Sequence, residues 1–316
     1  MNRRGFGITV GLILVIASNG SAQVKLPDHC YIFSSFRDPG APGLHLAWSG
    51  DGYHWAALGE DKIFMLPQVG KEKLVRDPCI LQGPDGEFQM VWTDSWKDRT
   101  IGYAHSPDLI HWSKQTAIPV MESEPTAMNC WAPEIDYDAG RKQYVIFWAT
   151  TIPGRFPDTD ASGDKGYNHR IYCVTSSDLV HFGPPKLMFD PGFDCIDATI
   201  LSTPGKFYMI FKDETYTPTH KYLCMASSSD IMGPYTNVTG SFTRNWVEGP
   251  TAIKIGDDYV VYYDCYRDHH YGAVRSKDLV HWEDITDRIS FPRGSRHGTV
   301  IEVNADVVGK LLSTQY

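Results

Sequence analysis

The chain has 316 residues and a formal net charge of −9 at pH 7, with 42% hydrophobic and 13% aromatic residues. This length is enough for one large domain or two small ones. The acidic balance argues against nucleic acid and anionic membranes as partners, whereas the many aromatic rings suit a sugar-binding cleft as well as a large core.

The first residues have the pattern of a secretory signal peptide. Arg3 and Arg4 precede an apolar stretch over residues 8–17, and small residues follow up to Ala22. The apolar stretch is shorter than a membrane-spanning helix. We therefore expect cleavage near Ala22, export to the periplasm or medium without membrane insertion, and a single folded domain over residues 23–316.

Seven cysteines in an exported chain raise the possibility of disulfides. Their number is odd, no CxxC pair occurs, and most lie in or beside apolar runs typical of strands. We expect mostly buried free thiols, which pack as small hydrophobic groups. One disulfide remains an alternative.

One phrase recurs five times among short β-rich runs that are separated by Gly, Pro, Asn and Asp. Examples are "AHSPDLIHW", which ends at Trp112, and "VRSKDLVHW", which ends at Trp282. Each copy has Ser, then Asp two residues later, then an aromatic residue. A unit repeated every fifty to seventy residues is typical of a β-propeller. We expect the Ser-x-Asp segments to be structural turns between outer strands, with the aspartates Asp51, Asp108, Asp178, Asp230 and Asp278.

A second series alternates with the first and marks the innermost strands. Each member combines a polar residue, a small residue or Pro, and a short apolar run. The polar residues that lead these strands are Asp77, Glu134, Asp197, Glu248 and His297. The innermost strands of a propeller surround one axis, so we expect these five side chains to stand in register around it.

The order of the two series predicts how the ring closes. The chain begins with the second half of a unit, over residues 30–55, and ends with a first half, over residues 297–303. We expect the N-terminal strands to complete the last blade, which leaves no open sheet edge. The predicted fold is all-β, a single five-bladed β-propeller.

Four acids and one imidazole around a common axis suggest glycoside hydrolysis. In that reaction one carboxylic acid protonates the leaving oxygen, and a carboxylate activates water or attacks carbon. A further carboxylate beside the acid raises its pKa by like-charge repulsion.

The series Asp-Pro, Trp-Ala-Pro-Glu-Ile, Ile-Asp, Glu-Gly-Pro and His-Gly resembles glycoside hydrolase family 43 over essentially the whole mature chain. The resemblance implies a five-bladed propeller that cleaves arabinose or xylose units with inversion. It implies that Asp77 is the general base, that Asp197 orients the acid and tunes its pKa, and that Glu248 is the general acid. It also implies an axial His297 that faces water or a bound calcium.

Two departures from the family pattern leave alternatives. Ala198 follows Asp197 where the family usually has Pro, and Asp190 and Asp194 are nearby rivals for the same role. In "FRDPG", Asp38 echoes the motif of Asp77, and we interpret it as a turn residue of the closing blade.

Further residues are candidates for contact with substrate. The resemblance places Trp131 and Glu134 in the pocket, with Glu134 supportive rather than catalytic. Trp96 and Trp246 follow or precede strands at the same rim and could stack on a sugar or belong to the core. Arg296, beside His297, is a candidate donor to sugar hydroxyls. No cofactor is required by this chemistry, and a structural Ca²⁺ on the axis is a possibility.

We expect an exo-acting glycosidase, most of all an α-L-arabinofuranosidase, because the stretch from Tyr31 to Trp55 resembles the branch of the family in which that activity is common. The expected partner is an oligo- or polysaccharide that contains arabinose or xylose. The enzyme alternatives are a β-xylosidase and a galactan-active hydrolase of the same fold. Alternatives of another class are an inert carbohydrate-binding propeller and a protein-interaction propeller.

Overall fold

The computed structural model of the chain describes residues 26–314. The signal peptide expected over residues 1–22 lies outside this range. Within it, α1 (Ala305–Ser313) is the one α-helix, and no helix there is long and apolar enough to cross a membrane.

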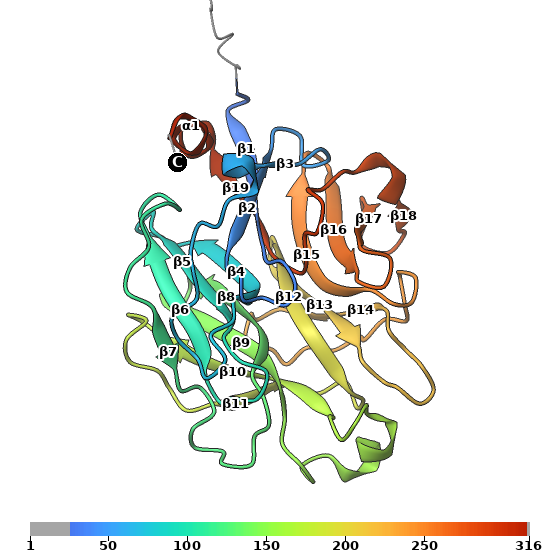
Figure 1. Ribbon diagram of the computed structural model, residues 1–316. Helices are drawn as coiled ribbons and strands as arrows, with labels where there is room; N and C mark the ends of the chain where they lie inside the picture. Colours follow the sequence, from blue (N-terminus) through green and yellow to red (C-terminus); the bar gives the residue numbers. More distant parts are fainter. Residues whose placement is uncertain (1–25, 315–316) are drawn as a thin grey trace, which may run out of the picture.

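Five antiparallel sheets follow one another around a ring, so the fold is the expected five-bladed β-propeller (Figure 1). Blade 1 contains β4 (Arg76–Gln82), β5 (Phe88–Thr93), β6 (Ile101–Ser106) and β7 (Thr116–Ile118). Blade 2 contains β8 (Trp131–Asp138), β9 (Gln143–Thr151), β10 (His169–Ser176) and β11 (Lys186–Phe189). Blade 3 contains β12 (Cys195–Thr203), β13 (Lys206–Asp213) and β14 (Leu223–Ser228). Blade 4 contains β15 (Glu248–Ile255), β16 (Asp258–Cys265), β17 (His270–Ser276) and β18 (Glu283–Asp284).

The closing blade joins the two ends of the described chain. It contains β19 (Val300–Asn304), β1 (His29–Ser35), β2 (His45–Ser49) and β3 (Ala56–Ala57), in that order. The innermost strand β19 pairs antiparallel with β1, from Phe33 opposite Val300 to His29 opposite Asn304. In Figure 1 the N-terminal strands, in blue, lie against the red β19 and α1. The closure expected from the order of the repeats is therefore confirmed.

Short 3₁₀ segments complete the connections, over η1 (Leu58–Asp61), η2 (Pro157–Ser162) and η3 (Thr286–Arg288). The four-stranded pattern is incomplete in blade 3. There the outermost strand is reduced to one bridge between Ser227 and Thr236. The segment between β9 and β10 carries η2.

The Ser-x-Asp segments are the predicted turns, each at the end of a third strand. In blade 2 the Oγ of Ser176 accepts the N–H of Leu179 at 2.8 Å, and Asp178 accepts the N–H of His181 at 2.8 Å. The ring of His181 closes the turn on the second carboxylate oxygen at 2.8 Å. These turns are satisfied by their own local bonds, so their aspartates are structural, as expected.

The core lies between neighbouring blades, where large rings pack face to edge. Trp92 and Trp148 are fully buried there. Gly102 on β6 is opposite Trp92, and a Cβ at this glycine would overlap the indole ring. All seven cysteines are buried and free, which confirms the expected thiols.

Candidate active site

Four of the inner strands begin with a β-bulge on the same side of the ring. The register shifts after Arg76, Trp131, Ile196 and Glu248. The next residue in each strand has a left-handed φ, and these residues are Asp77 (50°), Ala132 (47°), Asp197 (54°) and Gly249 (56°). A bulge re-aims a side chain at the end of a strand, and Asp tolerates this backbone region better than most residues.

The pairing also corrects one expectation, because the five predicted side chains are not in strict register. Asp77 and Asp197 occupy the bulge position, whereas Glu248 stands one residue earlier, opposite Asp264. Glu134 stands after the bulge, opposite Phe147, and so lies deeper along its strand. Motif spacing alone did not show these offsets, since they depend on which residues face each other across the strands.

Asp77 is held by groups from blade 1 and the closing blade. The hydroxyl of Thr93 donates to its Oδ2 at 2.8 Å, and the Nδ1 of His297 lies 3.3 Å from its Oδ1. Burial alone would raise the pKa of Asp77, but the His297 imidazolium, with Arg76 and Thr93, holds it at about 2. Asp77 is therefore ionised at neutral pH and fixed in orientation.

Asp197 lies on the other side of His297, with its Oδ2 3.9 Å from the imidazole Nδ1. The same oxygen accepts the backbone N–H of Gly249 at 3.0 Å. Burial and the carboxylates of Glu248 and Asp77 raise the pKa of Asp197 to about 6, although His297 opposes this. Burial opposes protonation of His297, yet the two aspartates raise the pKa of its imidazole to about 9.

Gly249 permits this close approach. Its φ of 56° favours glycine, and a Cβ there would overlap the imidazole of His297. The "Glu-Gly-Pro" motif thus brings the residue after Glu248 against both Asp197 and His297.

Glu248 stands in a chain of alternating charges. The Nζ of Lys212 is 3.3 Å from its Oε2 and 2.7 Å from the Oε2 of Glu214. The Nη2 of Arg296 is 3.0 Å from its Oε1, and the Nε of Arg296 is 2.6 Å from Asp264 Oδ2. Each cation near Glu248 therefore has a second acid of its own.

Lys212 and Asp264 were missed by the sequence reasoning. Both are almost fully buried, and each follows an apolar run at the inner end of a second strand. Burial and Glu248 raise the pKa of Asp264 to about 6, against the opposing effect of Arg296. In the sequence, the available signal was a charged residue at the end of an apolar run. The buried charge of Asp264 is explained by its pairing with Glu248 on the neighbouring strand.

Asp38 has a role beyond the expected turn. It lies in the segment between β1 and β2 and pairs with Arg296 and, at 3.3 Å, with Arg76. It therefore ties two arginines of the site to the closing blade.

Glu134 lies below this layer. The hydroxyl of Thr199 donates to its Oε2 at 2.9 Å, and that of Thr299 donates to its Oε1 at 3.2 Å. Burial raises the pKa of Glu134 to about 7, although the hydroxyls and His297 oppose this. Glu134 therefore contacts hydroxyl groups of the residues that surround the axis, in keeping with a supportive role.

Aromatic rings line the rim on the side of blades 1 and 2. The indole N–H of Trp131 donates to the carbonyl of Trp96 at 3.0 Å, and the two rings are edge to face. Trp131 also packs on Tyr167 and His169, with centroid distances of 4.8 and 5.1 Å. Trp246 stands elsewhere, with the guanidinium of Arg267 over its ring.

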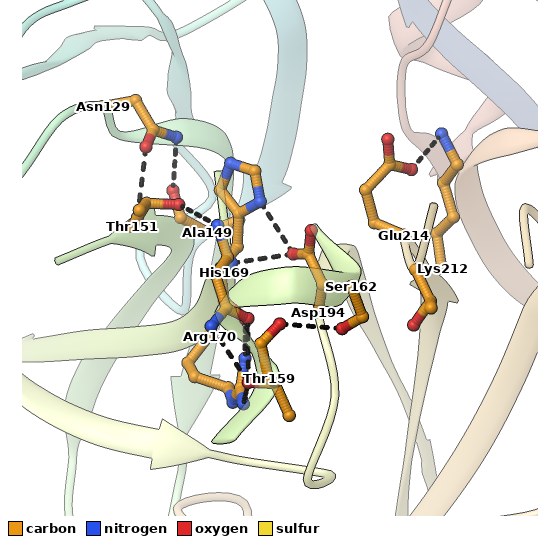
Figure 2. Close-up of polar contacts among 12 residues, drawn as sticks. Asn129, Ala149, Thr151, Thr159, Ser162, His169, Arg170, Asp194, Lys212 and Glu214 are labelled. Carbon is orange, nitrogen blue, oxygen red and sulfur yellow. Dashed lines mark hydrogen bonds and ion pairs between the residues drawn. The ribbon is translucent and has the colours of Figure 1, made fainter. Parts of the chain in front are cut away.

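The rival aspartates have other partners, and Figure 2 shows the contacts of Asp194 with His169. Asp194 is fully buried and accepts the Nδ1 of His169 at 2.9 Å and the backbone N–H of the same residue at 2.7 Å. Asp190 pairs with Arg170. Of the three candidates, Asp197 is the one beside His297.

The axial residues do not have the ligand set of a metal centre. Among residues 26–314, no group of three His, Cys, Asp or Glu side chains could hold a metal ion. The Nδ1 of His297 faces two carboxylates, which favours a protonated ring that cannot bind a cation through that nitrogen. The residues present do not form a calcium site of protein ligands, and a calcium held through water stays a prediction.

Cavity size does not identify the site. A cavity of about 870 Å³ lies between the outer parts of blades 1 and 2, lined in part by Tyr103, Val174 and Phe182. None of the axial residues contributes to it.

Comparison with known sequences gives an independent view of the chain. A family model described as a probable glycosyl hydrolase domain, related to family 43, matches residues 27–308. An alpha-L-arabinofuranosidase from Bifidobacterium longum subsp. longum is 24% identical over 225 residues, which are 58% of this chain and 21% of that protein. The chain thus spans about a fifth of the length of this relative.

Comparison with solved structures agrees with the fold. A thermostable family-43 glycoside hydrolase superposes with a TM-score of 0.54 at 17% identity, covering 71% of this chain and 78% of that one. A family-43 β-1,3-galactosidase with bound galactodeoxynojirimycin gives 0.54 at 14% identity, covering 76% and 83%. At these identities the similarity establishes the fold alone.

Proposed function

This chain belongs to the family of glycosyl hydrolase domains related to glycoside hydrolase family 43, and we propose that it is an inverting exo-glycosidase. The residue it removes is a terminal pentose, above all an α-L-arabinofuranosyl unit of a plant-type polysaccharide. The observation that carries the proposal is the convergence of Asp77 and Asp197 on the imidazole of His297, with Glu248 directly before Gly249, whose N–H Asp197 accepts.

In the proposed reaction Asp77 is the general base. The lowered pKa of Asp77, about 2, keeps this carboxylate ionised at neutral pH, which is the form a general base needs. That water attacks the anomeric carbon from the face opposite the leaving group. Thr93 and His297 fix the direction of the carboxylate, so the water is oriented before the reaction begins.

Glu248 is the proposed general acid, which gives its proton to the glycosidic oxygen as the bond to the anomeric carbon breaks. Asp197 supports this role because it accepts the N–H of Gly249, the residue that follows the acid. Lys212 and Arg296 hold the two oxygens of Glu248 in the resting site. All proton transfers in this scheme use side chains of the chain itself.

The choice of sugar rests on sequence similarity to the Bifidobacterium arabinofuranosidase. A β-xylosidase or a galactan-active hydrolase of the same fold is the alternative. We further propose that the protein acts after export, in line with the expected signal peptide.

The test is hydrolysis of a panel of 4-nitrophenyl glycosides that includes α-L-arabinofuranoside, β-D-xylopyranoside and β-D-galactopyranoside. We expect turnover of the arabinofuranoside and loss of turnover in Asp77→Asn. Proton NMR of the first-formed sugar should show the inverted anomer. Retention of configuration would exclude the proposed base. Binding of arabinan oligosaccharides without hydrolysis of any substrate would favour an inert carbohydrate-binding propeller.

A further inference from the structure

Asp264 is a buried acid to which the proposed reaction gives no role. It stands near the end of β16, directly opposite Glu248 across the strand pair, and its side chain is 1% exposed. Its Oδ2 accepts the Nε–H of Arg296 at 2.6 Å and the backbone N–H of His297 at 3.3 Å. Burial of a charge is costly unless the charge is paired, so the contact with Arg296 allows a carboxylate to lie this close to Glu248.

Arg296 is shared among three acids. Its Nε faces Asp264, its Nη2 lies 3.0 Å from the Oε1 of Glu248, and its Nη1 pairs with Asp38. The side chain of Arg296 is 13% exposed, so water screens these contacts only in part. Because the two aspartates hold the guanidinium at separate nitrogens, it cannot turn fully toward Glu248.

The position of Arg296 matters because a general acid must keep its proton until the glycosidic bond breaks. Two cations lie beside Glu248, with the Nζ of Lys212 at 3.3 Å and the Nη2 of Arg296 at 3.0 Å. A cation at this distance favours the ionised form of a carboxylic acid, whereas a neighbouring carboxylate favours the protonated form. Negative charge next to the two cations therefore helps Glu248 to remain a proton donor.

Lys212 and Arg296 each have such a negative partner. The Nζ of Lys212 lies 2.7 Å from the Oε2 of Glu214. Arg296 has Asp264, whose own pKa is raised to about 6 by burial and by Glu248, against the effect of Arg296. Repulsion between two carboxylates acts on both of them, so Asp264 also favours the protonated form of Glu248.

Other titratable groups surround Glu248 and Asp264. The charged ones belong to the axial group and are Asp77, Asp197 and His297. For three further groups the pKa is raised mainly by burial, which keeps them neutral near pH 7, and these are Tyr266, Tyr271 and Cys265. Asp264 therefore acts on Glu248 within a network of charges that the fold holds in place.

We propose that Asp264 is a positioning residue for the general acid, because it holds Arg296 by the Nε and limits how far that cation favours the ionised form of Glu248. The proposal rests on the proposed role of Glu248 in the reaction. It is separate from the role of Asp197, which accepts the backbone N–H of the residue after Glu248. Asp264 is buried and acts through a side-chain cation instead.

The first measurement does not depend on activity. The carboxyl carbon of Glu248 is followed by ¹³C NMR in the full chain, and its signal is assigned by its loss in Glu248→Gln. Asp264→Asn keeps the shape of the side chain but removes its charge, so the midpoint of the Glu248 titration should fall by about one pH unit. A midpoint that stays in place or rises would overturn the proposal.

The second measurement is the pH profile of hydrolysis. In Asp264→Asn the alkaline limb of kcat/KM for an arabinan oligosaccharide should move about one pH unit lower. The profile for 4-nitrophenyl α-L-arabinofuranoside should keep its position, because nitrophenol leaves with little protonation. A purely structural defect would lower both rates without moving either limb, and that result, or an equal movement of both limbs, would contradict the proposal.

Asp213→Asn is the matched control. Asp213 occupies the corresponding place in blade 3, at the end of β13 and opposite the first residue of β12, but it pairs with His220 at 3.1 Å. The Glu248 midpoint should not change in this variant. A fall as large as that in Asp264→Asn would show a general effect of a lost buried charge and would overturn the proposal.

Asp38→Asn covers the case in which Asp264→Asn does not fold. The side chain of Asp38 is 52% exposed and also pairs with Arg296, so its loss should lower the Glu248 midpoint in the same direction by a smaller amount. A rise in Asp38→Asn would contradict the proposal. Absence of wild-type turnover on both substrates, with the NMR shifts as expected, would instead contradict the proposed function.

Discussion

The outer turns and the inner strand starts of this propeller both repeat around the ring. The outer turns keep the same residue types in every blade, whereas the inner strand starts do not. At the outer turns each blade uses Asp for the same local task, as in the turn of Ser276 and Asp278. At the inner starts the group varies between blades, with Asp77 in blade 1, Asp197 in blade 3, Glu248 in blade 4 and His297 in the closing blade. The repeated positions build the scaffold, and the positions that differ between blades build the site.

The strongest test of this contrast is Asp77→Asn. The amide keeps the shape and can still accept from Thr93, but it cannot take a proton from water. We expect kcat to fall by roughly 10²–10⁴-fold, measured on the aryl glycoside that the wild type hydrolyses best. Asp178→Asn, an equally conservative change at an outer turn, should leave kcat unchanged. Comparable activity losses in the two variants would remove the distinction between the regions.

Glu248→Gln sharpens the comparison within the site. Without a proton donor, hydrolysis of an oligosaccharide should slow by roughly 10²–10⁴-fold. A nitrophenol leaving group needs little protonation, so the loss with the aryl glycoside should be much smaller. Steady-state rates on both substrates provide the measurement. Equal losses on both would mean that Glu248 does not protonate the leaving group.

His297 should affect stability in a pH-dependent way. Its pKa is raised from 6.5 to about 9 in the folded protein, so the folded state binds the proton more tightly than the unfolded state. The resulting stabilisation is complete below pH 6.5, declines as the pH rises, and is lost above pH 9. In urea unfolding, His297→Gln should lower the free energy of unfolding relative to wild type. This loss should be larger at pH 6 than at pH 9.5, by up to about 3 kcal/mol. The same difference at both values would argue against a protonated imidazole.

The smallest effect is expected at an outer turn of the blade that carries Glu248. Ser276→Ala removes the hydroxyl that accepts the N–H of Leu279 at 2.8 Å. The free energy of unfolding should fall by about 1 kcal/mol, while kcat/KM of the folded enzyme stays the same. Denaturant titration and steady-state kinetics on one preparation check both statements. A loss of activity at unchanged stability would contradict a purely structural role.

The same contrast explains what could be predicted from the sequence. The five turns with a common sequence pattern predicted the number of blades. The order of the half-units predicted that the N-terminal strands complete the last blade. Asp77, Asp197 and Glu248 were found because each sits in a short motif at the start of an apolar run. Their convergence followed from the geometry of a ring.

Lys212 and Asp264 could not be assigned in this way. Each resembles an ordinary strand end, and its importance appears only when the neighbouring strand is placed beside it. The one-residue offset of Glu248 from Asp77 and Asp197 has the same origin, because a β-bulge changes which residues face each other without a clear mark in the sequence.

The pairing of β1 with β19 has a consequence for how the protein is made. His29 meets Asn304 and Phe33 meets Val300, so the earliest strand emerges from the ribosome long before its partner has been synthesised. Until then β1 and β2 form an unfinished hairpin with an exposed edge, the kind of surface on which nascent chains aggregate. Contacts so distant in sequence also slow folding. The ring, and with it the arrangement of Asp77, His297 and Glu248, can form only once nearly the whole chain has been translated.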